Sequence, residues 1–110
     1  MVNLTDAWEI IYEKAKELLH TRAPYHNLRA GKTYRIHSVS REKIVIETDG
    51  KNKSFGRRSL LNQLRKLNEA GGIISYSNFF GNVARETTVV FLHPQLGWDN
   101  DGKNIVDMNA

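Results

Sequence analysis

Residues 43–72 read KIVIETDGKNKSFGRRSLLNQLRKLNEAGG, and this stretch decides the fold class. In its first half, Ile44 and Ile46 alternate with Lys43, Val45 and Glu47. The dipeptide Asp49-Gly50 that follows is typical of the tight turn between antiparallel strands, so Asn52 to Phe55 could be the next strand. Its second half repeats leucine at three- and four-residue spacing up to a pair of glycines, which predicts an amphipathic helix over residues 57–70. Strands followed by a helix predict a domain of the α+β class.

The residues before this stretch predict one more helix and one more strand. Apolar side chains at helical spacing over residues 5–21 predict an N-terminal amphipathic helix, capped by Thr5 or by a capping box of Asp6 and Glu9. Alternation over residues 34–39 predicts a strand that joins the two later ones in a small antiparallel sheet.

The residues after the second helix predict a C-terminal β-hairpin. Ile73–Tyr76 and Thr87–His93 are rich in β-branched and aromatic residues, and Asn78–Glu86 would be the loop between them. A competing interpretation makes residues 83–92 a short helix, because their apolar side chains also match helical spacing.

One hydrophobic core is expected to join these elements. The length of 110 residues fits a single domain, which we place at residues 1–97, followed by a polar tail at 98–110. The expected core residues come from both helices and the sheet: Trp8, Ile11, Leu18, Ile36, Ile44, Ile46, Leu60, Leu64 and Leu67.

The composition is that of a globular protein inside the cell. Hydrophobic residues make up 40% and charged residues 25% of the chain, and no apolar run approaches the ~20 residues that cross a membrane. Met1–Glu9 lacks the basic start and apolar stretch of a secretory signal. The chain has no cysteine, so disulfides and thiolate metal ligands are excluded, and we expect a cytoplasmic protein with no membrane partner.

Positive charge is concentrated in the middle of the chain. The net charge is +4, but residues 21–96 hold thirteen basic and five acidic residues, whereas residues 1–20 and 97–110 are each net acidic. A basic centre favours an anionic partner.

The predicted helix over residues 57–70 carries residue types that recognise nucleic acid. Its apolar stripe leaves one outward edge with two further polar residues beside it: Arg58, Asn62, Arg65 and Glu69, then Gln63 and Lys66. Arginine pairs with guanine, and asparagine or glutamine with adenine, through two hydrogen bonds each, so such a helix could enter a major groove.

A phosphate site is expected where this helix begins. Arg57 and Arg58 lie in its first turn, where backbone N–H groups also point at an anion, and a lysine-rich turn precedes them. The complete set of expected nucleic-acid-binding residues is Lys51, Lys53, Arg57, Arg58, Asn62, Gln63, Arg65, Lys66 and Arg85.

The string from Leu60 to Ile74, a leucine-rich helix that ends in glycines before an apolar strand, resembles the last helix and first wing strand of a winged-helix domain. The resemblance implies DNA binding, a wing between Asn78 and Glu86, and Arg85 at the wing tip. It covers about a third of the chain, and upstream of it two strands replace the helical pair of that family. The span from Tyr34 to Ile74 also resembles strand–strand–helix modules found with restriction endonucleases and mobile-element proteins.

We therefore expect a non-enzymatic nucleic-acid-binding module, with double-stranded DNA as the favoured partner. It would act as an independent protein, as a homodimer or as a module of a larger protein. Basic, amide-rich outer faces also occur on helices that only keep a protein in solution, and that interpretation stays open.

Two other functions also stay open. A protein-interaction domain would bury Trp98, Phe79 and Phe80 against a partner. A small nuclease would use His37 and Glu47, beside Arg35, on neighbouring strands.

No metal or cofactor site is expected. The four histidines, His20, His26, His37 and His93, show no ligand spacing. Residues 99–110 begin like a calcium-binding loop, but Ala110 stands where such a loop needs a glutamate.

Overall fold

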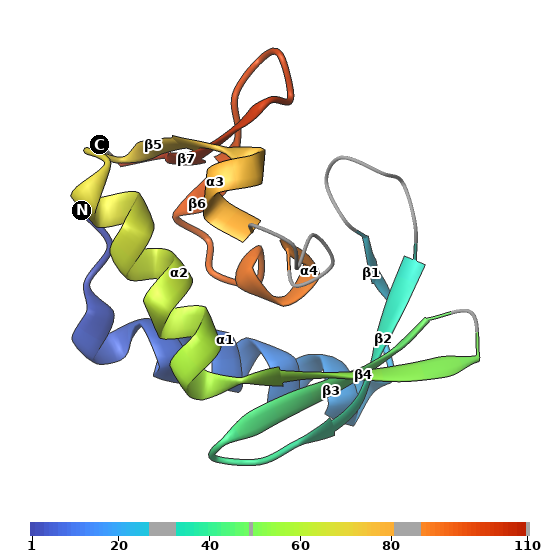
Figure 1. Cartoon of the computed structure of the whole chain (residues 1–110). Helices are drawn as coiled ribbons and strands as arrows, with labels where there is room; N and C mark the ends of the chain where they lie inside the picture. The colour runs from blue at the N-terminus through green and yellow to red at the C-terminus, as the bar shows by residue number, and fades with distance from the viewer. Residues whose placement is uncertain (27–32, 49, 81–86, 110) are drawn as a thin grey trace.

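The computed structural model describes residues 1–26, 33–48, 50–80 and 87–109. A long helix, a four-stranded antiparallel sheet, a second helix and a three-stranded antiparallel sheet follow one another, with two short helices beside the second sheet (Figure 1). In chain order the elements are α1 (Leu4–Thr21), β1 (Tyr25–His26), β2 (Thr33–Val39), β3 (Lys43–Thr48), β4 (Lys51–Gly56), α2 (Arg57–Glu69), β5 (Ile73–Ser75), α3 (Tyr76–Phe80), α4 (Thr87–Val90), β6 (Leu96–Trp98) and β7 (Asn104–Asp107). The Cα radius of gyration of 13.0 Å is that of one compact domain. The predicted α+β class is confirmed.

Helix α1 begins earlier than its sequence signals indicate. The Asn3 side chain caps it by accepting a hydrogen bond from the Thr5 backbone N–H at 2.9 Å. The predicted caps at Thr5 and at Asp6 are therefore wrong, because the asparagine ahead of them already occupies the capping position. Arg22 ends the helix in the left-handed conformation, with φ at 56°.

The four-stranded sheet has the order β1-β2-β3-β4, with Gly50 at φ 74° in the turn before β4. The register pairs Ile36 with Ile46 and Ile44 with Phe55, so these buried side chains share one face of the sheet. That face packs against α1 and closes one side of the core.

Helix α2 follows β4 without a linker and buries its leucine stripe. Its C-terminus is closed by two backbone hydrogen bonds, from the Gly72 N–H to the Leu67 oxygen at 3.0 Å and from the Gly71 N–H to the Asn68 oxygen at 3.1 Å. These two bonds form a Schellman motif, which needs a left-handed residue after the cap, and Gly71 fills that position with φ at 82°. Gly72 also has a positive φ, at 96°, so glycine suits both positions.

The C-terminal hairpin exists, but other residues form it. Strands β6 and β7 pair with each other, and β5 pairs with β7 rather than with residues 87–93. The predicted strand Thr87–His93 is wrong: it begins with α4, as the competing helical interpretation proposed. The predicted loop Asn78–Glu86 is wrong at its start, where α3 extends to Phe80, and its remainder lies outside the described residues.

The expected polar tail is also part of the fold. Strand β7 is the central strand of the second sheet, and Ile105 within it is fully buried. The predicted boundary of the domain at residue 97 is therefore wrong, because the chain returns after a polar turn to fill the core.

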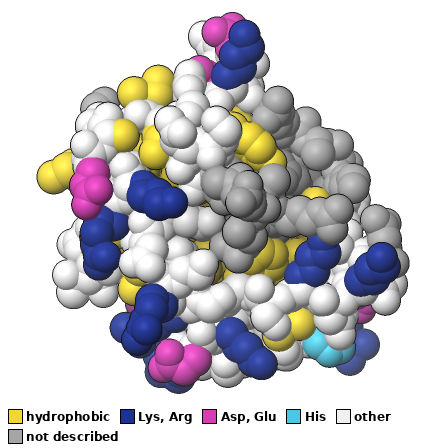
Figure 2. Space-filling model, viewed as in Figure 1, with side chains coloured by type: hydrophobic (Ala, Val, Ile, Leu, Met, Phe, Trp, Pro, Cys, Tyr) yellow, Lys and Arg dark blue, Asp and Glu magenta, His cyan; other side chains and the backbone are white. Residues whose placement is uncertain are grey.

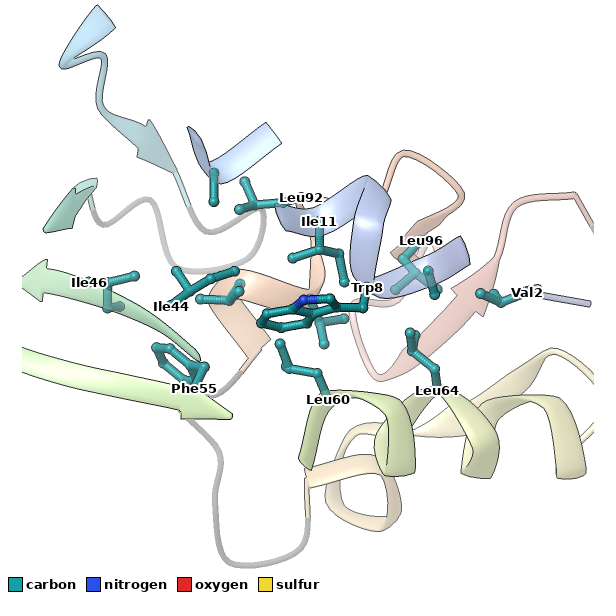
Figure 3. Close-up of a cluster of buried hydrophobic side chains, with 14 of the residues drawn as sticks. Val2, Trp8, Ile11, Ile44, Ile46, Phe55, Leu60, Leu64, Leu92 and Leu96 are labelled. Atoms are coloured by element: carbon teal, nitrogen blue, oxygen red, sulfur yellow. The ribbon is translucent and has the colours of Figure 1, made fainter. Parts of the chain in front are cut away.

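One core joins all of these elements (Figure 3). Trp8 lies at its centre, with Ile44, Ile46 and Phe55 of the sheet on one side and Leu96 and Val2 on the other. All nine predicted core residues are buried. The sequence analysis missed buried residues that come from short elements: Phe79, Val89, Val90, Leu96 and Ile105.

Within the described residues, no helix combines the length and the apolarity needed to cross a membrane.

Candidate functional site

Helix α2 presents most of the expected binding residues to solvent on one side. Arg58, Asn62 and Arg65 are exposed on the face opposite the buried leucines, with Arg57 and Lys66 exposed at its two flanks. The structure thus brings five of the nine expected residues together on one rigid element.

Gln63 is the exception on this helix. Its side chain is only 6% exposed, so the prediction that it stands beside the outward edge is wrong. It lies three residues after Leu60 and four before Leu67, which places it on the buried flank of the helix. The spacing of Gln63 from the two leucines could have indicated that it is buried. The sequence analysis placed it outside because glutamine is polar.

Asn62 and Arg65 act as a pair in this structure. The Arg65 guanidinium Nη1 donates a hydrogen bond to Asn62 Oδ1 at 3.2 Å. The bond orders the long arginine side chain at the centre of the outward face and leaves the Asn62 amide N–H groups as donors. For Asn62 to pair with adenine through both its polar atoms, this bond must open.

The cations of α2 differ from those of α1 in their partners. On α1, Lys14 lies 3.7 Å from Glu17 and Lys16 lies 3.6 Å from Glu13. Within the described residues, none of the four exposed cations of α2 lies within ion-pair distance of a carboxylate. The positive charge of α2 is therefore not neutralised by the part of the protein that the structure describes.

The first turn of α2 is only partly available to an anion. The Arg57 backbone N–H donates to the Glu42 oxygen at 2.9 Å, which fastens the helix to the preceding hairpin. The N-cap residue Gly56 supplies no side-chain cap. An arriving phosphate would meet the remaining first-turn groups and the two guanidiniums.

Lys51 and Lys53 do not join this face as expected. Strand β4 is extended, so Lys51 stands about 17 Å from Gly56 at the opposite end of the strand. Lys53 is half-buried opposite Ile46, on the face that packs against the core. The single surface predicted from their closeness in sequence is wrong, because a strand separates them from the helix.

Figure 2 shows Lys and Arg side chains over α2 and along the strands beside it, spaced by uncharged side chains and with acidic side chains among them. Arg85, the expected wing-tip residue, lies outside the described residues.

Two of the three residues expected to contact a protein partner can be placed, because the side chain of Phe80 lies outside the described residues. Phe79 is fully buried, so its predicted role in docking is wrong. Trp98 is half-buried and its ring lies 5.6 Å from that of Tyr76 and 5.3 Å from that of Phe91. The aromatic residues of this region contribute mainly to the fold.

The residues expected for a nuclease do share one pocket. Arg35, His37 and Glu47 line a cavity of ≈ 610 Å³ beside the C-terminal end of α1, which adds His20 and Arg22. The sequence analysis missed these last two, because only the packing of α1 against β2 brings them there.

Within the described residues, no group of three or more His, Asp or Glu side chains is placed to hold a metal ion. The Asp99 carboxylate instead accepts hydrogen bonds inside its own turn, from the side chain and backbone of Asn104 and from the Lys103 N–H. The Asn104 side chain is the main reason that the pKa of Asp99 is lowered.

Comparisons of the chain with protein-family models, with curated proteins and with solved structures find no match.

Proposed function

We propose that the protein binds nucleic acid, with double-stranded DNA as the favoured partner, through the outward face of α2. The observation that carries the proposal is the set of four exposed cations on this helix that have no carboxylate partner among the described residues. A helix face that only maintains solubility needs no excess of cations without carboxylate partners. On the exposed face of α1, by contrast, Lys14 and Lys16 each pair with a glutamate.

The dimensions of α2 suit this role. Its 13 residues span about 20 Å, which is long enough to cross a major groove. Arg58 and Arg65 would approach guanine edges from the centre of the face, whereas Arg57 and Lys66 at the flanks would contact phosphates. Lys51, at the far end of β4, would reach only a more distant phosphate.

The proposal is tested by fluorescence anisotropy with labelled duplex and single-stranded oligonucleotides over a salt series. Replacing Arg58 and Arg65 together with glutamine is expected to weaken duplex binding by about 1–3 kcal/mol for each lost base contact. The matched control is Lys14→Gln/Lys16→Gln, which removes the same charge from the ion-paired face of α1 and should bind as the wild type does.

Salt dependence separates this function from a protein-interaction domain. Phosphate contacts release counterions, so affinity should fall steeply as salt increases, whereas apolar docking changes little. Equal losses in the α1 and α2 variants, or no binding to either strand form at low salt, would refute the α2 interface.

A further inference from the structure

The pocket at the end of α1 has a composition that suggests a second binding site. Its cavity of ≈ 610 Å³ lies where the C-terminal turn of α1 meets strand β2. The polar side chains around it are His20, Arg22, Arg35, His37 and Glu47, and the apolar ones include Leu18, Leu19 and Ile36. The volume is in the range of pockets that hold small organic ligands.

The two guanidiniums of this pocket are not neutralised by a neighbouring carboxylate. Arg35 Nη1 donates to the backbone oxygen of Arg22 at 2.8 Å. Glu47 is the cross-strand neighbour of Arg35, yet within the described residues it forms no ion pair with either arginine. A bound anion would therefore gain both guanidiniums without breaking an existing ion pair.

A larger groove along α1 lacks this property. It has a volume of ≈ 820 Å³ and is lined by charged residues of α1 together with Leu92 and Pro94. Its lysines are paired with Glu13 and Glu17 within the helix, and its remaining acid, Glu9, is paired with Arg41. Paired charges offer little to an ionic ligand, so this groove is the weaker candidate.

We propose that the pocket at the end of α1 binds a phosphomonoester, either a nucleotide or the phosphorylated end of a nucleic-acid strand. Arg22 and Arg35 would hold the phosphoryl oxygens, because guanidinium groups match the geometry of this anion. His20 and His37 add imidazole donors. The apolar wall of leucines and Ile36 would contact the organic part of the ligand, and Glu47 would accept a hydrogen bond from a sugar hydroxyl.

Two features of the site oppose an anion, namely the carboxylate of Glu47 from β3 and the negative end of the α1 dipole. The guanidiniums of Arg22 and Arg35 would have to outweigh both.

The test is calorimetric titration of the folded protein with a nucleoside 5′-monophosphate, with the unphosphorylated nucleoside and with inorganic phosphate. The nucleoside should bind at least about tenfold more weakly than the nucleotide. If inorganic phosphate competes, the phosphoryl group itself is recognised. A 5′-phosphorylated and a 5′-hydroxyl oligonucleotide then distinguish a strand end from a free nucleotide.

Three variants make this test specific. Arg22→Asn keeps a residue type that tolerates the left-handed conformation of this position, and His37→Gln alters an exposed imidazole; each should weaken nucleotide binding about tenfold. Lys14→Gln, on the ion-paired face of α1, should leave it unchanged. Arg35 is kept, because its guanidinium also fastens the end of α1.

Equal binding of nucleotide and nucleoside, no binding of either at millimolar concentration, or wild-type affinity in both pocket variants would overturn the proposal. The outcome does not depend on the α2 interface, since Arg22→Asn should still bind a blunt, unphosphorylated duplex as the wild type does. Loss of duplex binding only in α2 variants, and loss of nucleotide binding only in pocket variants, would show two separate sites.

Discussion

His93 links the packing of single residues to the pH dependence of stability. It is 2% exposed, and its Nδ1 accepts a hydrogen bond from the Gln95 backbone N–H at 3.2 Å. Burial lowers the pKa of this imidazole below its ordinary value of 6.5, although the carboxylates of Asp6 and Asp107 raise it in part. The folded protein therefore holds His93 neutral at a pH where the unfolded chain already binds a proton.

Acidification from pH 7 is accordingly predicted to lower the free energy of unfolding, from about pH 6.5 down to the pKa of folded His93. The His93→Gln variant can keep the acceptor for Gln95 and should lose this slope. Urea unfolding of both proteins at a series of pH values measures the slope. A slope that is unchanged in His93→Gln would contradict this account.

Asp107 contributes to the pH dependence of stability in a lower pH range. Burial raises the pKa of Asp107, but hydrogen bonds from the Asn109 N–H and the Gln95 amide, together with the N-terminal ammonium 3.5 Å from Oδ2, hold it below the ordinary 3.8. A lowered carboxyl pKa contributes stability that is present above pH 3.8 and is lost as the pH falls through the folded value. The two residues therefore act in separate pH windows.

At the scale of elements, long periodic segments were predictable and short ones were not. The alternation before Gly50 and the leucine spacing of α2 each extend over enough residues to define a period. Strands β5 and β6 have three residues each, and α4 has four, so no period can be read from them. Their conformations follow from tertiary contacts, such as the burial of Val89 and Val90.

The candidate site was predictable to the same degree. The exposed arginines of α2 follow from its leucine stripe, whereas the separation of Lys51 from the helix follows from the extension of β4. In the pocket at the end of α1, the sequence brought together Arg35, His37 and Glu47 of neighbouring strands. It could not indicate His20 and Arg22, because only the packing of α1 against β2 brings these two there.

The start of α2 offers a test at the scale of the element. Gly56 has φ −79°, and a Cβ added there would meet nothing within 4 Å, so other residues fit. Gly56→Ser and Gly56→Asp should both stabilise the protein by a few tenths to about 1 kcal/mol, since each supplies the missing N-cap. Thermal unfolding measures this gain.

The two variants should differ in nucleic-acid binding. The carboxylate of Gly56→Asp would stand beside Arg57 and Arg58 and repel phosphate, whereas the hydroxyl of Gly56→Ser would not. We expect only the aspartate variant to lose duplex affinity in anisotropy measurements. Equal affinity in both variants would exclude a phosphate contact at this end of α2.

At the scale of the whole molecule, the last strand completes the core. Strand β7 lies between β5 and β6, and its residues 104–106 pair with residues 73–75, some thirty positions earlier. The sequence analysis missed this strand for two reasons. The segment around it is polar, and its buried side chains alternate with outward ones over only four residues. Topology, rather than local sequence, gives this segment its structure.

Ile105→Ala is therefore predicted to lower the free energy of unfolding by about 2–4 kcal/mol, because it leaves a cavity in the core. The neighbouring Val106→Ala, at a half-buried position on the outer face of the same strand, is the control and should cost clearly less. Chemical denaturation of both variants measures the difference. A loss of less than about 0.5 kcal/mol for Ile105→Ala would agree with a disordered tail and contradict the fold.

The central claim, that the outward face of α2 contacts nucleic acid, is tested most directly by titrating the ¹⁵N-labelled protein with a short DNA duplex and following the backbone amide resonances by NMR. The account predicts the largest shifts at Arg57–Lys66, among them Arg58, Asn62 and Arg65, and little change along the ion-paired face of α1 at Glu13–Glu17. Shifts confined to α1 or to the β5–β7 sheet, or no shifts at low salt, would contradict it.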